Sequence, residues 1–191
     1  MTPRADYRAE PELPALVRGG LRLAAELRFE NSCGPGYGRL LRTLAARGGL
    51  IGELGTGCGV GTAWMLDGMP STAHLITIEM DPIRAAAARV LLAVDPRAEV
   101  LEGDSRRLLK MGPFDLLFAD GGGKDPDWAD EVVAALRRPG GTLVLDDLMW
   151  GEPPGQDQLG SLWLGHPSLV ATKVMTHSPN WAPIIATRRE S

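Results

Sequence analysis

The sequence has few cysteines, few aromatic residues and no long apolar run. Two of its 191 residues are cysteines, and aromatic residues make up 5% of the chain. Cys33 and Cys58 are too few for the disulfide framework of a small secreted domain, and their spacing matches no metal-binding motif. No segment approaches the ~20 consecutive apolar residues that a membrane-spanning helix requires. We therefore expect a cytoplasmic protein with no membrane partner.

Runs of basic residues are also absent, and the formal net charge at pH 7 is −4. This balance argues against nucleic acid or an anionic membrane surface as the main partner. Residues 1–30 carry several charges and lack the apolar core of a secretory signal peptide. The hydrophobic content of 44% and the charged content of 23% are typical of a globular domain. The length suits one domain over residues 1–191.

From residue 50 onward, short apolar segments alternate with helix-like segments. This alternation predicts a mostly parallel sheet with helices on both faces, an α/β fold. The expected strands are 50–54, 74–79, 99–101, 114–119 and 142–145, followed by an antiparallel hairpin of 169–175 and 181–187. Helices are expected at 15–29, 37–46, 59–67, 82–94, 104–110 and 125–138, and a loop at 151–160. The domain then consists of an N-terminal arm and helices over 1–47 and a seven-stranded core over 48–191.

A glycine-rich turn follows the first expected strand. Glycines occupy every second position from Gly55 to Gly61, and the chain then continues as a helix. Glycine lets the backbone approach a ligand closely and adopt a positive φ, and a helix N-terminus attracts anionic groups. The dinucleotide-binding fingerprint fails, because Val60 and Thr62 stand where its third glycine is required. A flexible turn that binds no ligand is the simplest alternative.

The same turn fits a different pattern, in which an acidic residue is followed by glycines at alternate positions. Glu53, Gly55, Gly57 and Gly59 match this pattern, and Thr56 lies inside the turn. It resembles the first motif of the class I methyltransferases that use S-adenosylmethionine (SAM). The resemblance implies a Rossmann-like fold in which these five residues form part of the SAM-binding site.

Acidic residues also follow the second and third expected strands. Glu79 closes the second strand, where nucleotide-binding folds place an acid on the ribose, because a carboxylate accepts from two hydroxyls at once. Asp104 and Ser105 follow the third strand. SAM enzymes use an acid at that place to accept the adenine amino group, so the resemblance assigns both residues to the cofactor. Asp104 has an alternative role as the N-cap of the next helix.

Later segments resemble a narrower family, the cation-dependent O-methyltransferases, which include catechol and caffeoyl-CoA O-methyltransferases and small bacterial relatives. The similar segments are 53–56, 114–120, 138–151 and 184–189. In that family, an acid ending the fourth strand and an acid–amide pair ending the fifth bind a divalent metal. The matching positions are Asp120, Asp146 and Asp147, and Asp147 replaces the usual amide. Oxygen ligands suit Mg²⁺, with Mn²⁺ or Ca²⁺ as alternatives. Asp120 is also expected to take part in cofactor binding and catalysis.

Two further residues complete the expected site. The family has a lysine shortly after the fourth-strand acid, and Lys124 lies one position further along, after three glycines. A lysine that reaches the acceptor can take up its hydroxyl proton, whereas a solvated loop lysine would have no role. Trp150 follows Asp147 by three residues and is expected to stack on an aromatic acceptor. Trp163 is a weaker candidate, because tryptophan often packs structural hairpins.

These features predict a SAM-dependent O-methyltransferase that acts, with a divalent metal, on the hydroxyl of a small, catechol-like molecule. Two alternatives stay open. A metal-independent SAM methyltransferase would have the acids at 146 and 147 merely at the end of the sheet. In a non-catalytic SAM-binding module the acceptor site would be incomplete. The three glycines at 121–123 keep this alternative open, because they supply no side chain to that site. A homodimer also stays open.

Overall fold

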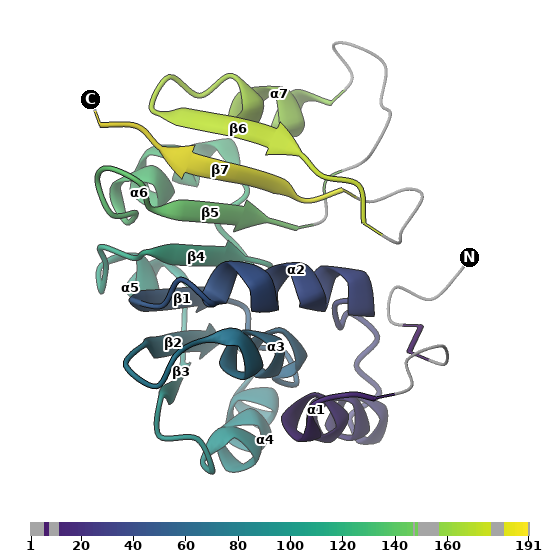
Figure 1. Cartoon of the computed structure of the whole chain (residues 1–191). Coiled ribbons are helices and arrows are strands. Elements are labelled where there is room, and N and C mark those ends of the chain that lie inside the picture. The colour runs from purple at the N-terminus through teal and green to yellow at the C-terminus, as the bar shows by residue number, and fades with distance from the viewer. Residues whose placement is uncertain (1–5, 8–11, 147, 149–156, 177–181, 191) are drawn as a thin grey trace.

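The centre of the structure is a mixed sheet of seven strands, seen in Figure 1. This computed structural model describes residues 6–7, 12–146, 148, 157–176 and 182–190. The strands are β1 (Leu50–Leu54), β2 (His74–Glu79), β3 (Ala98–Glu102), β4 (Leu116–Ala119), β5 (Thr142–Leu145), β6 (Leu169–Lys173) and β7 (Ile184–Arg188). Their spatial order is β3-β2-β1-β4-β5-β7-β6. The first five strands of the chain, β1 to β5, run parallel to one another, while β7 is antiparallel to both β5 and β6. The predicted parallel sheet with a terminal antiparallel hairpin is confirmed.

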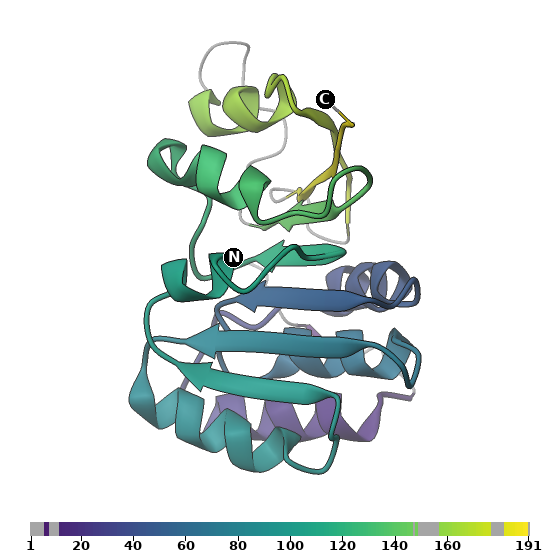
Figure 2. The ribbon, with the colours of Figure 1, turned by 90° about the vertical axis from the view of Figure 1, so that its left-hand side faces the viewer.

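Helices cover both faces of the sheet (Figures 1 and 2). One face carries α1 (Ala15–Glu26), α2 (Pro35–Ala45), α3 (Val60–Gly68) and α4 (Pro82–Leu92). The other carries α5 (Arg106–Leu109), a 3₁₀ helix (Pro126–Trp128), α6 (Ala129–Ala134) and α7 (Gln158–Leu164). Because both faces are covered, the central strands are mostly apolar, and every residue of β4 and β5 is buried. Within the described residues, no helix has the length and apolarity to cross a bilayer.

The carboxyl end of β1 lies where the strand order reverses. Strand β1 pairs in parallel with β2 on one side and with β4 on the other. Leu54 stands opposite Ile78 and Ala119, and Ala119 stands opposite Leu145. The residues that follow β1, β2, β4 and β5 therefore share one edge of the sheet. In open α/β sheets this reversal point is where ligands bind.

Several elements differ from the prediction. The segment expected as a loop at 151–160 is helical from Gln158, because the side chain of Asp157 caps α7 by accepting from the backbone N–H of Gly160 at 2.7 Å. The helix expected at 15–29 ends at Glu26, and Arg28 has a left-handed φ of 53°. That reversal leaves Phe29 outside the helix. The strand expected from Phe114 begins two residues later.

Candidate active site

The turn after β1 packs backbone to backbone against the chain that leaves β4. Gly55 has a φ of 99°, and a Cβ added to it would lie 2.5 Å from the nitrogen and 2.6 Å from the Cα of Gly121. Atoms do not approach that closely, so position 55 requires glycine. The N–H of Gly121 also donates to the carbonyl of Leu54 at 2.6 Å. These contacts place Asp120, the residue before Gly121, beside the glycine turn.

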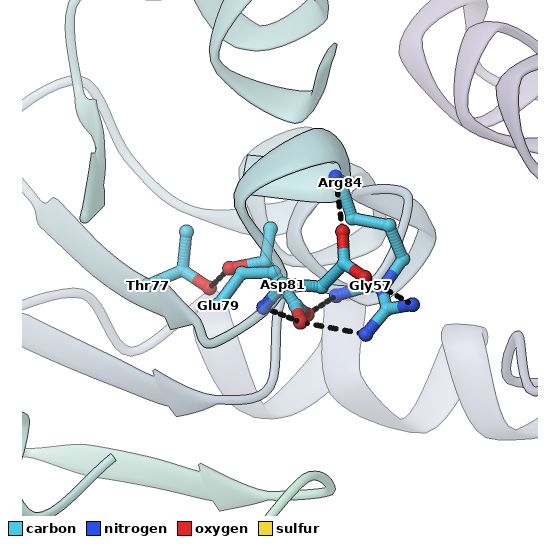
Figure 3. Close-up of polar contacts among 6 residues, drawn as sticks. Gly57, Thr77, Glu79, Asp81 and Arg84 are labelled. Atoms are coloured by element: carbon cyan, nitrogen blue, oxygen red, sulfur yellow. Dashed lines mark hydrogen bonds and ion pairs between the residues drawn. The ribbon is translucent and has the colours of Figure 1, made fainter. Parts of the chain in front are cut away.

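Glu79, at the end of β2, joins the glycine turn to the start of α4 (Figure 3). Its Oε2 accepts from the backbone N–H of Gly57 at 2.8 Å. Its Oε1 accepts from the N–H of Asp81 and from Nη2 of Arg84, both at 2.9 Å. Asp81 caps α4 by accepting from the N–H of Arg84 at 2.9 Å. The Glu79 carboxylate is therefore buried and held in one orientation by three donors.

Phe29 and Arg84 cover the outer side of the glycine turn. The guanidinium of Arg84 lies 5.0 Å from the centre of the Phe29 ring, a cation–π distance. A Cβ added to Gly57, whose φ is 54°, would lie 2.9 Å from Cε1 of Phe29. The aromatic ring thus rests directly on the glycine backbone. Any ligand that lies along Gly57 must share this space with Phe29.

A cleft opens between the turn and the segment that joins α1 to α2. Its lining includes Phe29, Cys33, Glu53, Thr56 and Asp120, together with the glycines of the turn. Burial is the main cause that raises the pKa of the Cys33 thiol, and the negative charges of Asp120 and then of residue 146 add to it. The Cys33 thiol therefore lines the cleft in its uncharged form, with the carboxylates of Asp120 and Asp146 nearby.

Glu53 is a buried acid beneath this cleft. Its Oε2 accepts from the hydroxyl of Thr62 and from that of Thr77, the latter at 2.6 Å. A further hydrogen bond of 2.6 Å joins the hydroxyls of Thr77 and Thr56. Burial raises the pKa of Glu53 to about 7, and the two threonine donors partly oppose that rise. The network links the floor of the cleft to strand β2 and helix α3.

The carboxylates of Asp120 and Asp146 follow neighbouring strands at matching positions. Ala119 and Leu145 are register partners, and the N–H of Asp146 donates to the carbonyl of Ala119 at 3.2 Å. Both acids are half-buried. Carboxylate oxygens are the ligands that a hard divalent cation prefers. The described residues contain no group of three potential metal-binding side chains, and the predicted third ligand, Asp147, lies outside them.

A protein-family model described as "Methyltransferase domain" matches residues 53–148, about half of the chain. The chain belongs to this methyltransferase family. A curated relative, the catechol O-methyltransferase of Niastella koreensis, is 32% identical over 131 residues, covering 62% of this chain and 58% of the relative. The chain thus spans a little over half the length of that relative.

Solved structures resemble this methyltransferase domain over nearly its whole length. Cofactor-bound Rv0187 from MTB gives a TM-score of 0.80 at 23% identity, covering 97% of this chain and 94% of that protein. The O-methyltransferase TomG from Streptomyces achromogenes, in complex with SAM, gives 0.78 at 20% identity, covering 95% and 92%. At such identities the likeness establishes the fold, and the Rossmann-like methyltransferase fold is confirmed.

The methyltransferase domain brings most of the predicted site residues together. Those on or beside the cleft are Glu53, Gly55, Thr56, Gly57, Glu79 and Asp120. Gly59 is the N-cap of α3 with a φ of 81°. Ser105 lies next to the loop after β4, since a Cβ on Gly122 would be 3.4 Å from its Oγ. Trp150 lies outside the described residues, so its stacking role stays a prediction.

Asp104, a predicted cofactor-binding residue, lies at the surface and not in the cleft. It is exposed after β3, and its Oδ1 accepts from the N–H of Arg106 at 2.7 Å. The N-cap of α5 is Ser105, one residue later than predicted, and no side chain caps it. Asp104 therefore supports the start of α5 without being its N-cap, and its adenine role stays a prediction.

Sequence reasoning missed the residues that hold the acids in place. Thr77 carried a usable signal, because a polar side chain within the apolar strand β2 needs a buried partner. Arg84 lies three residues after Asp81 and forms an ion pair with it at 3.4 Å, which helical spacing permits. Phe29 carried no signal, because it reaches the turn only through the left-handed reversal at Arg28.

The raised pKa of Glu53 should make stability depend on pH near neutrality. The native state holds this proton more tightly than the unfolded chain, whose pKa is the ordinary 4.5. The stability that Glu53 contributes is therefore full below about pH 4.5 and is lost as pH rises through about 7. When the pH is raised from 5 to 8, the free energy of unfolding of the wild type should fall by roughly 2–3 kcal/mol more than that of the Glu53→Gln variant, which cannot titrate at this position. Urea unfolding at both pH values measures this, and parallel pH profiles for the two proteins would contradict it.

Proposed function

We propose that this domain transfers the methyl group of SAM to a hydroxyl of a small, catechol-like molecule, assisted by a divalent cation. The observation that carries the proposal is the convergence of a glycine turn, a fixed Glu79 and the acids Asp120 and Asp146 at one edge of the sheet. The descriptions of two similar proteins support it. The curated relative is named catechol O-methyltransferase, and TomG was solved in complex with SAM.

The cofactor would lie along the glycine turn, with its ribose at Glu79. A carboxylate offers about four acceptor positions, and three are used by Gly57, Asp81 and Arg84. One acceptor position therefore remains, and two ribose hydroxyls need two. The Arg84 side chain must then leave Oε1 of Glu79 when the ribose binds. Asp104 at the end of β3 would accept the adenine amino group.

The acceptor would lie on the side of Asp120. Asp120, Asp146 and Asp147 are the residues that would hold a divalent cation, which lowers the pKa of a hydroxyl bound to it. The segment with Cys33 forms the facing wall of the cleft. Asp120 belongs to both halves of the site, because it lines the cleft beside the glycine turn and also follows β4 next to Asp146.

In the transfer step, the acceptor oxygen bonds to the methyl carbon as the carbon–sulfur bond breaks. The electron pair of that bond returns to sulfur, and S-adenosylhomocysteine is released. The chain's own task is to hold the acceptor oxygen about 3 Å from the methyl group and to remove the hydroxyl proton. Lys124, half-buried at the end of the loop after Asp120, is the residue proposed to accept that proton in its neutral amine form, because an ammonium group has no lone pair to take one up.

One assay separates this proposal from its alternatives. The purified chain is incubated with SAM and catechol, with Mg²⁺ or with excess EDTA, and methylated product and S-adenosylhomocysteine are quantified. Product that forms with Mg²⁺ and stops with EDTA supports the proposal. Product in both conditions points to a metal-independent methyltransferase. SAM binding in calorimetry without methylation of any hydroxyl acceptor points to a non-catalytic SAM-binding module.

Glu79→Ala should weaken SAM binding by about 1.5–3 kcal/mol, the range for hydrogen bonds to a charged group. The variant loses the acceptor for the ribose and also the bond that fixes Gly57. Calorimetric titration with SAM measures the change. Glu99→Ala is the matched control, because Glu99 is an exposed acid on the neighbouring strand β3. If both variants bound SAM as tightly as the wild type, the ribose assignment would be wrong.

A further inference from the structure

Trp163 connects the C-terminal part of the fold to the loop that carries Lys124. Its side chain is fully buried in α7 and belongs to the core on that face of the sheet. Its indole Nε1 donates a hydrogen bond of 2.9 Å to the backbone carbonyl of Lys124, although the two residues are 39 positions apart. A buried indole N–H needs a partner, and the Lys124 carbonyl supplies it. Trp163 therefore fixes the backbone at the residue proposed to accept the proton.

The loop from Asp120 to Lys124 has little stiffness of its own. Its three central residues are glycines, which lose more conformational freedom on ordering than any other residue. The near end is tied to β1, because the N–H groups of Asp120 and Gly121 both donate to the carbonyl of Leu54. The far end is tied at Lys124 by the indole of Trp163. Removal of that bond should loosen the backbone at Lys124 while the near end stays in place.

Trp163 is itself held by a well-connected helix. Asp157 caps α7 through the N–H of Gly160 and forms an ion pair with Lys173 of β6. The indole also stacks on His166, with ring centres 6.4 Å apart and an angle of 21° between the planes. In Figure 1, α7 and β6 lie side by side at one end of the sheet. The bond to Lys124 thus starts from a fixed position.

We propose that Trp163 is a positioning residue for methyl transfer, which acts by holding the backbone of Lys124 so that its side chain reaches the acceptor hydroxyl. The inference rests on the proposed function and deepens it. Trp163 touches neither cofactor nor acceptor, and its effect passes through one hydrogen bond. Loss of that bond lowers the rate of transfer and leaves the affinity for SAM unchanged, because the SAM-binding contacts lie on the turn after β1 and on β2.

The test begins with Trp163→Phe, which keeps an aromatic ring in the core and removes the N–H donor. We expect kcat to fall about 10- to 100-fold, the scale for misplacement of a catalytic group by about 1 Å, with the KM for SAM within twofold. Replacement of Trp163 by 3-benzothienylalanine, in which sulfur stands in place of the N–H, keeps almost the full side-chain volume. It should reproduce the fall in kcat even where the phenylalanine variant folds poorly.

A double-mutant cycle distinguishes positioning from general stability. In a Lys124→Met background, Trp163→Phe should lower kcat no further. An equal fall in both backgrounds would overturn the inference, because Trp163 would then act elsewhere. A Lys124→Met variant with full kcat would overturn it too, and would leave methyl transfer from SAM intact as the proposed function.

A second readout does not depend on activity. The chain has three lysines, Lys110, Lys124 and Lys173, so labelling by an amine-selective reagent can be followed at each by mass spectrometry. Trp163→Phe should change the labelling rate of Lys124 several-fold and leave that of Lys110 unchanged. If the wild type methylates no acceptor, the proposed function fails, and this measurement still decides whether Trp163 fixes Lys124. Unchanged labelling of Lys124 would overturn the inference.

Discussion

Replacing Gly55 by alanine should abolish SAM binding by this domain. The new Cβ would lie 2.5 Å from the nitrogen and 2.6 Å from the Cα of Gly121. Both are backbone atoms that a rotamer change cannot move, so the turn after β1 and the loop after β4 must separate. The separation would open the proposed cofactor position beside the glycine turn and move Asp120 away from it. Calorimetry should detect no SAM binding at concentrations that saturate the wild type.

Gly140→Ala is the matched control for this substitution. Gly140 also has a positive φ, 93°, but nothing lies within 4 Å of its added Cβ. It measures the strain of alanine in a left-handed conformation, about 1–2 kcal/mol, without a collision. If the Gly55→Ala and Gly140→Ala variants bound SAM with the same affinity, the close approach of Gly55 and Gly121 would not matter for the site. Gly121→Ala, whose Cβ would lie 2.8 Å from the Cα of Gly55, tests the same contact from the other side.

The part of the site that was predictable from the sequence is local. The glycine turn and Glu53 lie within a few residues of each other, and their spacing reports a backbone conformation. Acids at the ends of successive strands could be placed together, because parallel strands end at the same edge. Asp120 and Asp146 do follow register partners. The sheet was predictable for the same reason, since each strand–helix unit is encoded in consecutive residues.

What the sequence could not give is the set of contacts between distant segments. Helix α7 lay in a segment rich in glycine and proline, and its cap at Asp157 becomes visible only with the side chain in place. The bond from Trp163 to Lys124 spans 39 positions and has no periodic signature. Phe29 rests on Gly57 only because the chain reverses after α1. Such contacts depend on how whole elements pack, and short-range patterns do not encode them.

The position of Glu79 illustrates how the two levels combine. Its place at the end of β2 was read from the sequence, whereas its three donors appear only in the structure (Figure 3). Those donors change the expectation for binding, because Arg84 occupies the carboxylate oxygen that the proposed ribose contact would need. A site that looks open in the sequence is therefore partly filled by its own chain. Under the proposed ribose assignment, the cofactor would gain its contact with Glu79 at the expense of the Arg84–Glu79 ion pair.

Asp146→Ala should lower the rate of catechol methylation at least 100-fold. The variant removes the carboxylate of Asp146, which follows β5 next to the end of β4, and with it a ligand of the proposed cation. An acceptor that loses its anchor also loses the acidification of its hydroxyl, an effect of several kcal/mol. SAM should still bind within about twofold of the wild-type affinity, because Glu79 and the glycine turn are untouched. Initial rates across a Mg²⁺ titration, with calorimetry for SAM and Mn²⁺, measure both effects.

Two variants and one treatment complete the experiment. Asp127→Ala removes a carboxylate from an exposed position in the 3₁₀ helix and should leave the rate unchanged. Asp147→Asn should have a mild effect, because it restores the amide usual in the cation-dependent family that the sequence resembles. Excess EDTA should reproduce Asp146→Ala. Full methylation in excess EDTA, or an Asp146→Ala variant with wild-type rates, would show that the carboxylates at the ends of β4 and β5 serve the sheet and not a cation, and the domain would then be a metal-independent methyltransferase.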